Sequence, residues 1–276
     1  MSDIVWIIAP WSLNTKDFQR FRNKKVVCSI YHIENFSKNS VEVNKIIELD
    51  KFVDAYHTIS IKTKDELDKI TEKPVYYIPL WVNQNIWYHI KNKKDLRVKY
   101  NFGNEDFLVG SFQRDTESKD LSSPKLVKGP DIFINIVKNL YKENKNLKVV
   151  LTGKRRQYVI SELKKNKIPF KYFEMTNFEM LNELYNVLDL YLVTSRIEGG
   201  PQALVECGQT KTPILSTKVG IADQILAPES IFDYEDISSF NKVKPNVEFA
   251  FKESSKLVIP NGMLKYIKMF EEVHES

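Results

Sequence analysis

Glycine is absent from the first 102 residues of this 276-residue sequence, because all nine glycines lie at Gly103 or later. Glycine-rich turns let backbone amides approach a phosphate closely. The first part of the chain therefore cannot contain a glycine-rich phosphate loop. Glycines at Gly110, Gly129, Gly153 and Gly199–Gly200 mostly lie near expected strand ends, so we expect the phosphate-binding part of the protein there.

Cysteine is also scarce, since Cys28 and Cys207 are the only two. They are far apart and form no CxxC or Cys/His pattern, so neither a disulfide framework nor a structural zinc site is indicated. A reducing, cytoplasmic compartment is expected. The apolar stretch Ile4–Trp11 follows an acidic residue and is too short to span a bilayer. It predicts a buried strand.

Neither sign of charge dominates, because 41 Lys and Arg face 36 Asp and Glu. Basic runs occur at Lys91–Lys94 and Lys154–Arg156. Such runs are usually solvated faces, and the alternative is attraction to a nucleotide phosphate or to an anionic membrane surface. No basic region carries a helix-turn-helix, RNP-like or zinc-knuckle pattern, so no nucleic acid partner is expected.

Short apolar runs alternate with amphipathic lysine-rich stretches, a pattern typical of an α/β protein. The expected strands are Ile4–Ala9, Val26–Tyr31, Tyr56–Ile61, Val75–Leu80, Phe107–Phe112, Lys148–Gly153, Phe170–Phe173, Leu188–Thr194 and Pro213–Ser216. The expected helices are Thr15–Arg22, Val41–Lys51, Lys64–Thr71, Pro130–Glu143, Gln157–Asn166, Asn177–Asn186, one that begins at Pro201, Ala222–Leu226 and Met263–His274. The second series predicts a parallel sheet wound with helices, a Rossmann-like unit.

The length favours two domains. We expect the first over residues 1–95, the second over 96–260, and a C-terminal helix over 261–276 that packs back on the first. In that helix Met263, Ile267, Phe270 and Val273 recur at helical spacing. The polar segment Asn83–Lys94 is expected to interrupt the α/β pattern. Residues 115–128 are expected to form a long surface loop.

The most informative stretch runs from Leu188 to Thr217, where a buried strand leads into a Gly-Gly-Pro turn and then a helix. Pro201 suits the first helical position and Gly200 the cap. The helix N-terminus would face the carboxyl end of the sheet, where free amides and the helix dipole stabilise a diphosphate. Glu198 and Glu206 could each accept hydrogen bonds from hydroxyls on either side of that diphosphate. The alternative is that both are ordinary surface residues.

The segment SRIEGGPQALVE, Ser195 to Glu206, resembles the Glu-x7-Glu motif of glycosyltransferase family 4, whose members share the GT-B fold of two facing Rossmann-like domains. The resemblance implies that Glu198 contacts the hydroxyls of the donor sugar and that Glu206 contacts the ribose. The donor-binding residues implied are Gly153, Ser195, Glu198, Gly199, Gly200, Pro201, Gln202 and Glu206. Residues 96–260 would then bind the nucleotide sugar.

Further matches supply the remaining candidates. VVCSIYHIE, which ends at Glu34, resembles the family strand with a catalytic histidine, here His32. Gly110–Arg114 and Lys128-Gly129 match positions where an arginine and a lysine neutralise the donor diphosphate, so Arg114 and Lys128 join His32 and Glu198 as catalytic candidates. VVLTGK resembles the next family strand, and it lacks the P-loop pattern GxxxxGK[ST].

The resemblance implies a retaining transferase that moves a sugar from a nucleoside diphosphate sugar to a hydroxyl of a carbohydrate or lipid-linked acceptor. No cofactor and no essential metal are expected. Peripheral contact with the inner face of a membrane is compatible with the basic runs. Family members begin with a glycine-rich loop and more α/β units, so residues 1–95 are expected to be a shortened acceptor-side domain. The alternatives are a nucleotide-sugar-binding subunit that needs a partner chain, and a sugar-nucleotide epimerase or hydrolase.

Overall fold

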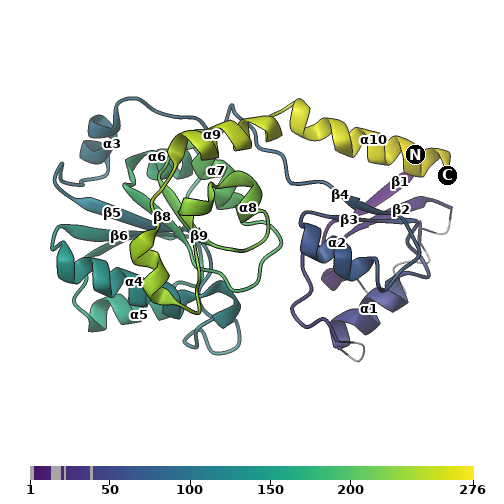
Figure 1. Ribbon diagram of the computed structural model, residues 1–276, viewed down its shortest axis with the longest axis horizontal. Coiled ribbons are helices and arrows are strands. Elements are labelled where there is room, and N and C mark those ends of the chain that lie inside the picture. The colour runs from purple at the N-terminus through teal and green to yellow at the C-terminus, as the bar shows by residue number, and fades with distance from the viewer. Residues whose placement is uncertain (1–2, 14–19, 22, 38–39) are drawn as a thin grey trace. The chain divides into compact units, whose positions relative to one another are not determined.

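The computed structural model describes residues 3–13, 20–21, 23–37 and 40–276. The chain forms two compact units (Figure 1): unit 1 comprises residues 1–81 and 259–276, and unit 2 comprises residues 82–258. Each unit has a parallel sheet accompanied by helices. Most of the predicted helix Thr15–Arg22 lies outside the described residues.

Unit 1 has a four-stranded parallel sheet in the order β1-β2-β3-β4. Its strands are β1 (Ile4–Ile7), β2 (Lys25–Ser29), β3 (Ala55–Thr58) and β4 (Val75–Tyr77), and its helices are α1 (Val41–Leu49), α2 (Ile61–Leu67) and α10 (Asn261–Glu275). Successive side chains of a strand point to opposite faces. Val26 and Cys28 accordingly join the core beneath α1, whereas Val27 packs with Met269 of α10.

Helix α10 packs within unit 1 through Tyr266, Met269 and Val273, which are 1–3% exposed. Ile267 is 49% exposed, so the apolar spacing from Met263 predicts the helix and misplaces its buried face. The reason is that Tyr266 lies in an aromatic cluster with Trp6 and donates its hydroxyl proton to carbonyl groups at the end of β4. A polar tip with a partner makes tyrosine a good core residue.

Unit 2 has a six-stranded parallel sheet in the order β10-β9-β8-β5-β6-β7. Its strands are β5 (Phe107–Ser111), β6 (Leu147–Thr152), β7 (Phe170–Phe173), β8 (Leu190–Val193), β9 (Ile214–Thr217) and β10 (Ile231–Phe232). The chain adds β6 and β7 on one side of β5 and then returns to add β8, β9 and β10 on the other. The strand order reverses between β5 and β8, and ligands of open α/β sheets bind outside the carboxyl ends at such a switch point.

Helices cover both faces of the sheet of unit 2 (Figure 1). They are α3 (Lys93–Lys99), α4 (Pro130–Glu143), α5 (Gln157–Lys165), α6 (Phe178–Val187), α7 (Gln202–Thr210), α8 (Ala222–Ile225) and α9 (Val247–Ser254). Leu108 of β5 joins the core with α6 to α9, and its neighbour Val109 joins the core with α4 and α5. Short 3-10 helices are η1 (Pro10–Ser12), η3 (Leu126–Lys128), η4 (Pro228–Ser230), η5 (Ile237–Lys242) and η6 (Ser255–Leu257).

Residues 82–95, placed with the first domain by sequence, belong to unit 2. The amide of Val82 donates to the carbonyl of Leu257 at 2.9 Å, and Trp87 is buried against Tyr185. The segment also leads directly into α3, a helix that was not predicted. Asn92 caps that helix, because its side chain accepts a hydrogen bond from the amide of Asp95. Asparagine is a preferred N-cap residue, but here it stands within a basic run that was interpreted by its charge.

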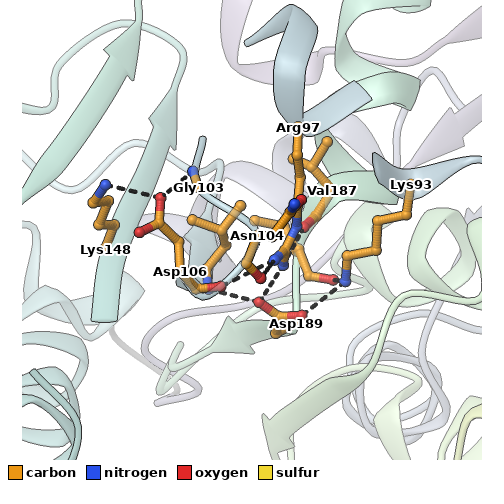
Figure 2. Close-up of polar contacts among 10 residues, drawn as sticks. Lys93, Arg97, Gly103, Asn104, Asp106, Lys148, Val187 and Asp189 are labelled. Carbon is orange, nitrogen blue, oxygen red and sulfur yellow. Dashed lines mark hydrogen bonds and ion pairs between the residues drawn. The ribbon is translucent and has the colours of Figure 1, made fainter. Parts of the chain in front are cut away.

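A charged cluster ties α3 to the amino ends of the strands (Figure 2). The carboxylate of Asp189, just before β8, accepts from Arg97 at 2.5 Å, from Lys93 at 2.8 Å and from the amide of Leu108 at 2.8 Å. We call these four residues the amino-edge cluster. Arg97 also donates to backbone carbonyls, among them that of Val187, so it is an integral part of the fold although it is charged.

Among the described residues, none of the helices combines the length and apolar character that crossing a membrane requires.

Candidate functional site

The loops that follow β5 and β8 meet at the switch point of unit 2. Lys128, at the end of η3, places its Nζ 2.5 Å from Oε1 of Glu198, which lies in the loop between β8 and α7. Oε2 of Glu198 accepts a hydrogen bond from the hydroxyl of Ser195 at 2.8 Å. Both charged side chains are about one-fifth exposed, at 21% and 18%. The predicted residues Lys128, Ser195 and Glu198 therefore form one cluster, in which a ligand could reach both charges.

Gln113, in the loop after β5, supports this cluster. The side-chain amide of Gln113 donates to the backbone carbonyl of Lys128 at 2.9 Å, and its Oε1 lies 3.1 Å from the hydroxyl of Ser195. Gln113 thus links the two loops, and sequence reasoning missed it because its partners are 15 and 82 residues away along the chain.

Two glycines let the loops approach each other. Gly129, with φ of +62°, caps α4, and a Cβ there would lie 1.7 Å from the carbonyl oxygen of Thr194. Gly220, with φ of +57°, faces Gly199, where the corresponding distance to the carbonyl oxygen is 2.3 Å. Any side chain at either position would push the loops after β5, β8 and β9 apart.

Helix α7 starts at this cluster. It begins at Gln202, so Pro201 is the N-cap, one residue later than the predicted cap at Gly200. Proline has no side-chain acceptor for the first amides, and no side-chain cap hydrogen bond is present at this helix. Amides at an uncapped N-terminus, together with the helix dipole, favour an anion. Gln202 is exposed, whereas Gly199 and Pro201 are buried.

Glu206 lies in the second turn of α7 and is only 8% exposed. Its Oε2 accepts a hydrogen bond from the hydroxyl of Tyr185 at 2.7 Å. Burial penalises the charged form and raises the pKa of Glu206 to about 7, and the hydrogen bond from Tyr185 opposes that rise. The alternative that both glutamates are ordinary surface residues is therefore wrong, because Glu206 is buried and Glu198 is largely so.

Arg114 follows β5 and is exposed, and no hydrogen bond or ion pair joins it to another residue in the described ranges. Its neighbour Asp115 is 2% exposed and pairs with Arg156, Nε to Oδ2, at 2.5 Å. The prediction that residues 115–128 form a surface loop is thus wrong at its start. The interpretations of Lys154–Arg156 as a solvated or phosphate-attracting run are wrong at Arg156, which is 1% exposed.

The reason is that Arg156 joins two strand ends. Its guanidinium donates to the carbonyl of Ser111 at the end of β5, at 2.6 Å, and to that of Thr152 at the end of β6, at 3.0 Å. Gly153 follows directly with φ of +81°, and the nearest atom to a Cβ built there is the carbonyl oxygen of Phe112 at 3.7 Å. The left-handed backbone, and not crowding, makes glycine suitable there.

His32 lies in unit 1, three residues after β2, and is about one-third exposed. Its Nε2 is 3.7 Å from Oε1 of Glu34. Together with Trp11 and Lys45 it lines a cavity of about 100 Å³. Because His32 belongs to the other unit, its catalytic role stays a prediction.

A second histidine of unit 1, which sequence reasoning did not single out, is structural. His57 is fully buried, its Nδ1 is 2.8 Å from the hydroxyl of Ser29, and its Nε2 is 2.9 Å from the carbonyl of Ile78. A carbonyl can only accept, so Nε2 carries the proton and Nδ1 accepts from Ser29. Burial lowers the pKa of His57, which keeps the ring neutral.

Arg196, also not predicted, fixes the start of the β8 loop. Its guanidinium forms two hydrogen bonds, of 2.8 and 2.6 Å, with the carboxylate of Asp131 in the first turn of α4. The only sequence signal was its place between the predicted residues Ser195 and Glu198. Over the residues that the structure describes, no group of three or more His, Cys, Asp or Glu side chains is arranged to hold a metal ion.

Comparison with known families matches the part of the chain that carries this cluster. A model of the family described as "Glycosyl transferases group 1" matches residues 121–242. Uncharacterized protein 356 of Sulfolobus islandicus rod-shaped virus 1 is 34% identical over 103 residues, which are 37% of this chain and 27% of that protein. The chain thus spans about a quarter of the length of this curated relative.

Solved structures match almost the whole chain. Sucrose-phosphate synthase from Thermosynechococcus elongatus is 12% identical with a TM-score of 0.79, over 99% of this chain and 74% of that one. HepE from Anabaena, in complex with UDP and glucose, is 13% identical with a TM-score of 0.78, over 99% and 78%. The two parallel sheets and their helices therefore match the fold of GT-B glycosyltransferases, which confirms the predicted fold class.

Proposed function

We propose that this chain transfers a sugar from a nucleoside diphosphate sugar to a hydroxyl acceptor, with retention of the anomeric configuration, as a member of glycosyltransferase family 4. One observation carries the proposal. At the switch point of unit 2, a lysine–glutamate pair lies beside an uncapped helix N-terminus, and a buried glutamate follows in the second turn of that helix. A pyrophosphate flanked by two sugar rings matches this order of cation, amides and carboxylates.

The Lys128–Glu198 pair would be divided between two parts of the donor. The diphosphate would bind Lys128 together with the backbone amides of Gly199, Gly200 and Gln202. The sugar hydroxyls would donate to the carboxylate of Glu198. Glu198 would keep its hydrogen bond from Ser195, which would hold the carboxylate in place. The ion pair of the free protein thus arranges both groups before the donor binds.

Catalysis would come mainly from stabilising the leaving group. The acceptor oxygen would bond to the anomeric carbon while the bond from that carbon to the diphosphate oxygen breaks, on the same face of the sugar. The acceptor proton would pass to the departing diphosphate. Lys128, Arg114 and the N-terminus of α7 would stabilise the negative charge that develops there. This scheme uses neither a cofactor nor an essential metal.

The proposed acceptor is a hydroxyl of a carbohydrate or of a lipid-linked carbohydrate, in a cytoplasmic protein with peripheral contact to the inner membrane face. Within the basic run Lys91–Lys94, Lys93 is occupied by Asp189, whereas Lys91 and Lys94 are exposed. Any electrostatic attraction to anionic lipid from this run would therefore come from Lys91 and Lys94. Vesicle co-sedimentation with and without anionic lipid tests that part.

The donor proposal is tested by calorimetric titration with UDP-, GDP- and ADP-sugars, followed by NMR of the product anomer in EDTA. We expect tight binding of one donor class and turnover that survives EDTA. The Glu206→Ala variant should bind that donor at least tenfold more weakly. Glu143→Ala, which changes an exposed glutamate at the far end of α4, is the matched control and should bind like the wild type. Equal affinity of wild type and Glu206→Ala for every donor would refute the ribose role.

A second candidate is a nucleotide-sugar-binding subunit that needs a partner chain. It is favoured by the four-stranded sheet of unit 1 and by a family match that covers residues 121–242 alone. A monomer by native mass spectrometry that turns over donor would exclude it. Loss of turnover in His32→Ala would at the same time support the catalytic role of His32. Product analysis without acceptor separates transfer from epimerase or hydrolase activity.

A further inference from the structure

Tyr185 donates a hydrogen bond to the Glu206 carboxylate, and the family resemblance assigned it no role. It lies on α6, is 2% exposed and donates its hydroxyl proton to Oε2 of Glu206 at 2.7 Å. Three rings surround it, with centroids 4.8 Å away at Phe112, 5.7 Å at Trp87 and 5.4 Å at Tyr191. Aromatic neighbours at these distances hold a ring in one orientation, so the hydroxyl is fixed with respect to Glu206.

The two carboxylates of the site differ in charge compensation. Glu198 has a cation on one oxygen and a serine hydroxyl on the other. For Glu206, the hydrogen bond from Tyr185 is the only one that its carboxylate accepts within the described part of the chain, and no lysine or arginine pairs with it there. A neutral donor favours the ionised form without cancelling its charge. The remaining lone pairs of Glu206 accept from no residue that the structure describes, so hydroxyl donors of a ligand could use them.

We propose that Tyr185 is a positioning residue, which keeps the Glu206 carboxylate aimed and ionised for the ribose hydroxyls of the donor, so that donor binding is coupled to proton release. The proposal rests on the proposed function. An ionised carboxylate can only accept, and it takes two hydroxyl donors without rearrangement, whereas a protonated one would present a competing O–H. Below neutral pH, Glu206 would have to lose its proton before the ribose binds.

The direction of the effect of Tyr185→Phe follows from linkage. The variant keeps the buried ring and removes the hydrogen bond that Tyr185 donates to Glu206, so ionisation of the carboxylate becomes harder and its pKa rises. A rise of about one pH unit from a starting value of about 7 lowers the ionised fraction at pH 7 about fivefold. Donor affinity should fall by that factor at pH 7 and recover at pH 9.

The test measures the affinities of UDP, GDP and ADP and of their 2′-deoxy counterparts by calorimetry between pH 5.5 and 9, in buffers of different ionisation enthalpy. Below pH 7, binding of the nucleotide to the wild type should release on the order of one proton to the buffer. The pH at which the nucleotide reaches half of its maximal affinity should be higher in Tyr185→Phe than in the wild type. The pH dependence should be lost in Glu206→Gln, and it should be weaker for the deoxy nucleotide.

Tyr191→Phe is the matched control. It removes another buried tyrosine hydroxyl from the same ring cluster, one that accepts from the amide of Phe112, whereas the Glu206 carboxylate accepts its hydrogen bond from Tyr185. It should leave the pH midpoint unchanged. A loss of affinity in Tyr185→Phe that is the same at every pH would show a merely structural role and overturn the proposal.

A second measurement does not depend on a ligand. The carbon-13 shift of the Glu206 carboxyl, followed against pH in the wild type and in Tyr185→Phe, reports the pKa directly. If that pKa is the same in both proteins, the positioning role of Tyr185 is refuted even if nucleotides bind. If it rises but no nucleotide binds either protein, the proposed function fails, and the coupling of binding to proton release fails with it.

Discussion

The sheet of unit 2 has one charged cluster at the amino ends of its strands, the amino edge, and another at their carboxyl ends, the carboxyl edge. The two clusters differ in how completely their charges are matched. At the amino edge, Asp189 is held by Arg97, Lys93 and a backbone amide. At the carboxyl edge, the neutral hydroxyl of Tyr185 is the one group among the described residues that donates to the Glu206 carboxylate, and Lys128 and Glu198 remain partly exposed. A saturated cluster has no capacity for a ligand, whereas an unsaturated one at a switch point does. The difference supports the proposal that the residues at the carboxyl ends of the strands bind a ligand, whereas the amino-edge cluster is structural.

Removing the acid of the amino-edge cluster should have the largest effect on stability. In Asp189→Ala the guanidinium of Arg97, 7% exposed, would keep its charge without a counter-ion. Breaking one side of a buried pair costs about 3–5 kcal/mol. Urea unfolding should show that loss, and Glu105→Ala, at an exposed glutamate in the turn before β5 of the same unit, should change the free energy of unfolding by less than about 0.5 kcal/mol. A similar small loss in Asp189→Ala would contradict the structural assignment.

Removing the cation at the carboxyl edge should act on turnover instead. Lys128→Ala should lower kcat about 10²–10³-fold, as the loss of one preorganised group at a developing charge does. Its effect on the free energy of unfolding should stay below about 1 kcal/mol, because the pair with Glu198 is partly exposed. Lys128→Arg should restore part of the activity. If turnover of Lys128→Ala equals that of the wild type, Lys128 does not stabilise the leaving group.

Glu206→Gln should change how stability depends on pH. Burial raises the pKa of Glu206 from 4.5 to about 7 in the folded state, so the folded protein binds this proton more tightly than the unfolded chain. Stability from this group is present below pH 4.5 and is lost as the pH rises through 7, by about 3 kcal/mol at most. The variant should lack that slope and be more stable than the wild type at pH 8, while it binds donor more weakly. Parallel stability–pH curves would refute the raised pKa.

The smallest effect is expected at Arg196. Its pair with Asp131 is about one-third exposed on both sides, so solvent screens the interaction and Arg196→Ala should cost about 0.5–1 kcal/mol. Arg196→Lys keeps the charge and loses the bidentate geometry. The urea midpoint of the lysine variant should therefore lie between those of the wild type and the alanine variant. A loss above about 2 kcal/mol would place Arg196 with the structural charges of the amino edge.

Local signals predicted much of the secondary structure. Helix α4 and strand β7 begin and end where the sequence predicts, because a proline at the helix start and a short apolar run each act within a few residues. Helix α9 was missed. It packs on α7 where a Cβ at Gly208 would lie 2.3 Å from the hydroxyl of Ser254. A contact between segments that are distant in sequence produces no periodic pattern in α7 or in α9.

The same limit applies to the site. Its acidic residues, Gly199, Gly200 and the position of its helix were predicted from one continuous segment, Ser195 to Glu206, whereas Gly220, which faces Gly199, was not predicted. Gln113, Arg156 and Tyr185 were not predicted as partners, and Arg156 was misread as exposed. Each of them acts on atoms that other parts of the chain supply, through contacts that no short motif records.

The amino-acid sequence alone determined the α/β class, the strand–turn–helix unit after residue 188 and the chemical types gathered at one sheet edge, because these follow from patterns within about 30 residues. Only the tertiary structure decided which charges are matched. Glu206 meets Tyr185 across 21 residues, and Lys128 meets Glu198 across 70. Burial and ion pairing depend on what surrounds a group in space, and packing of the whole sheet sets those surroundings.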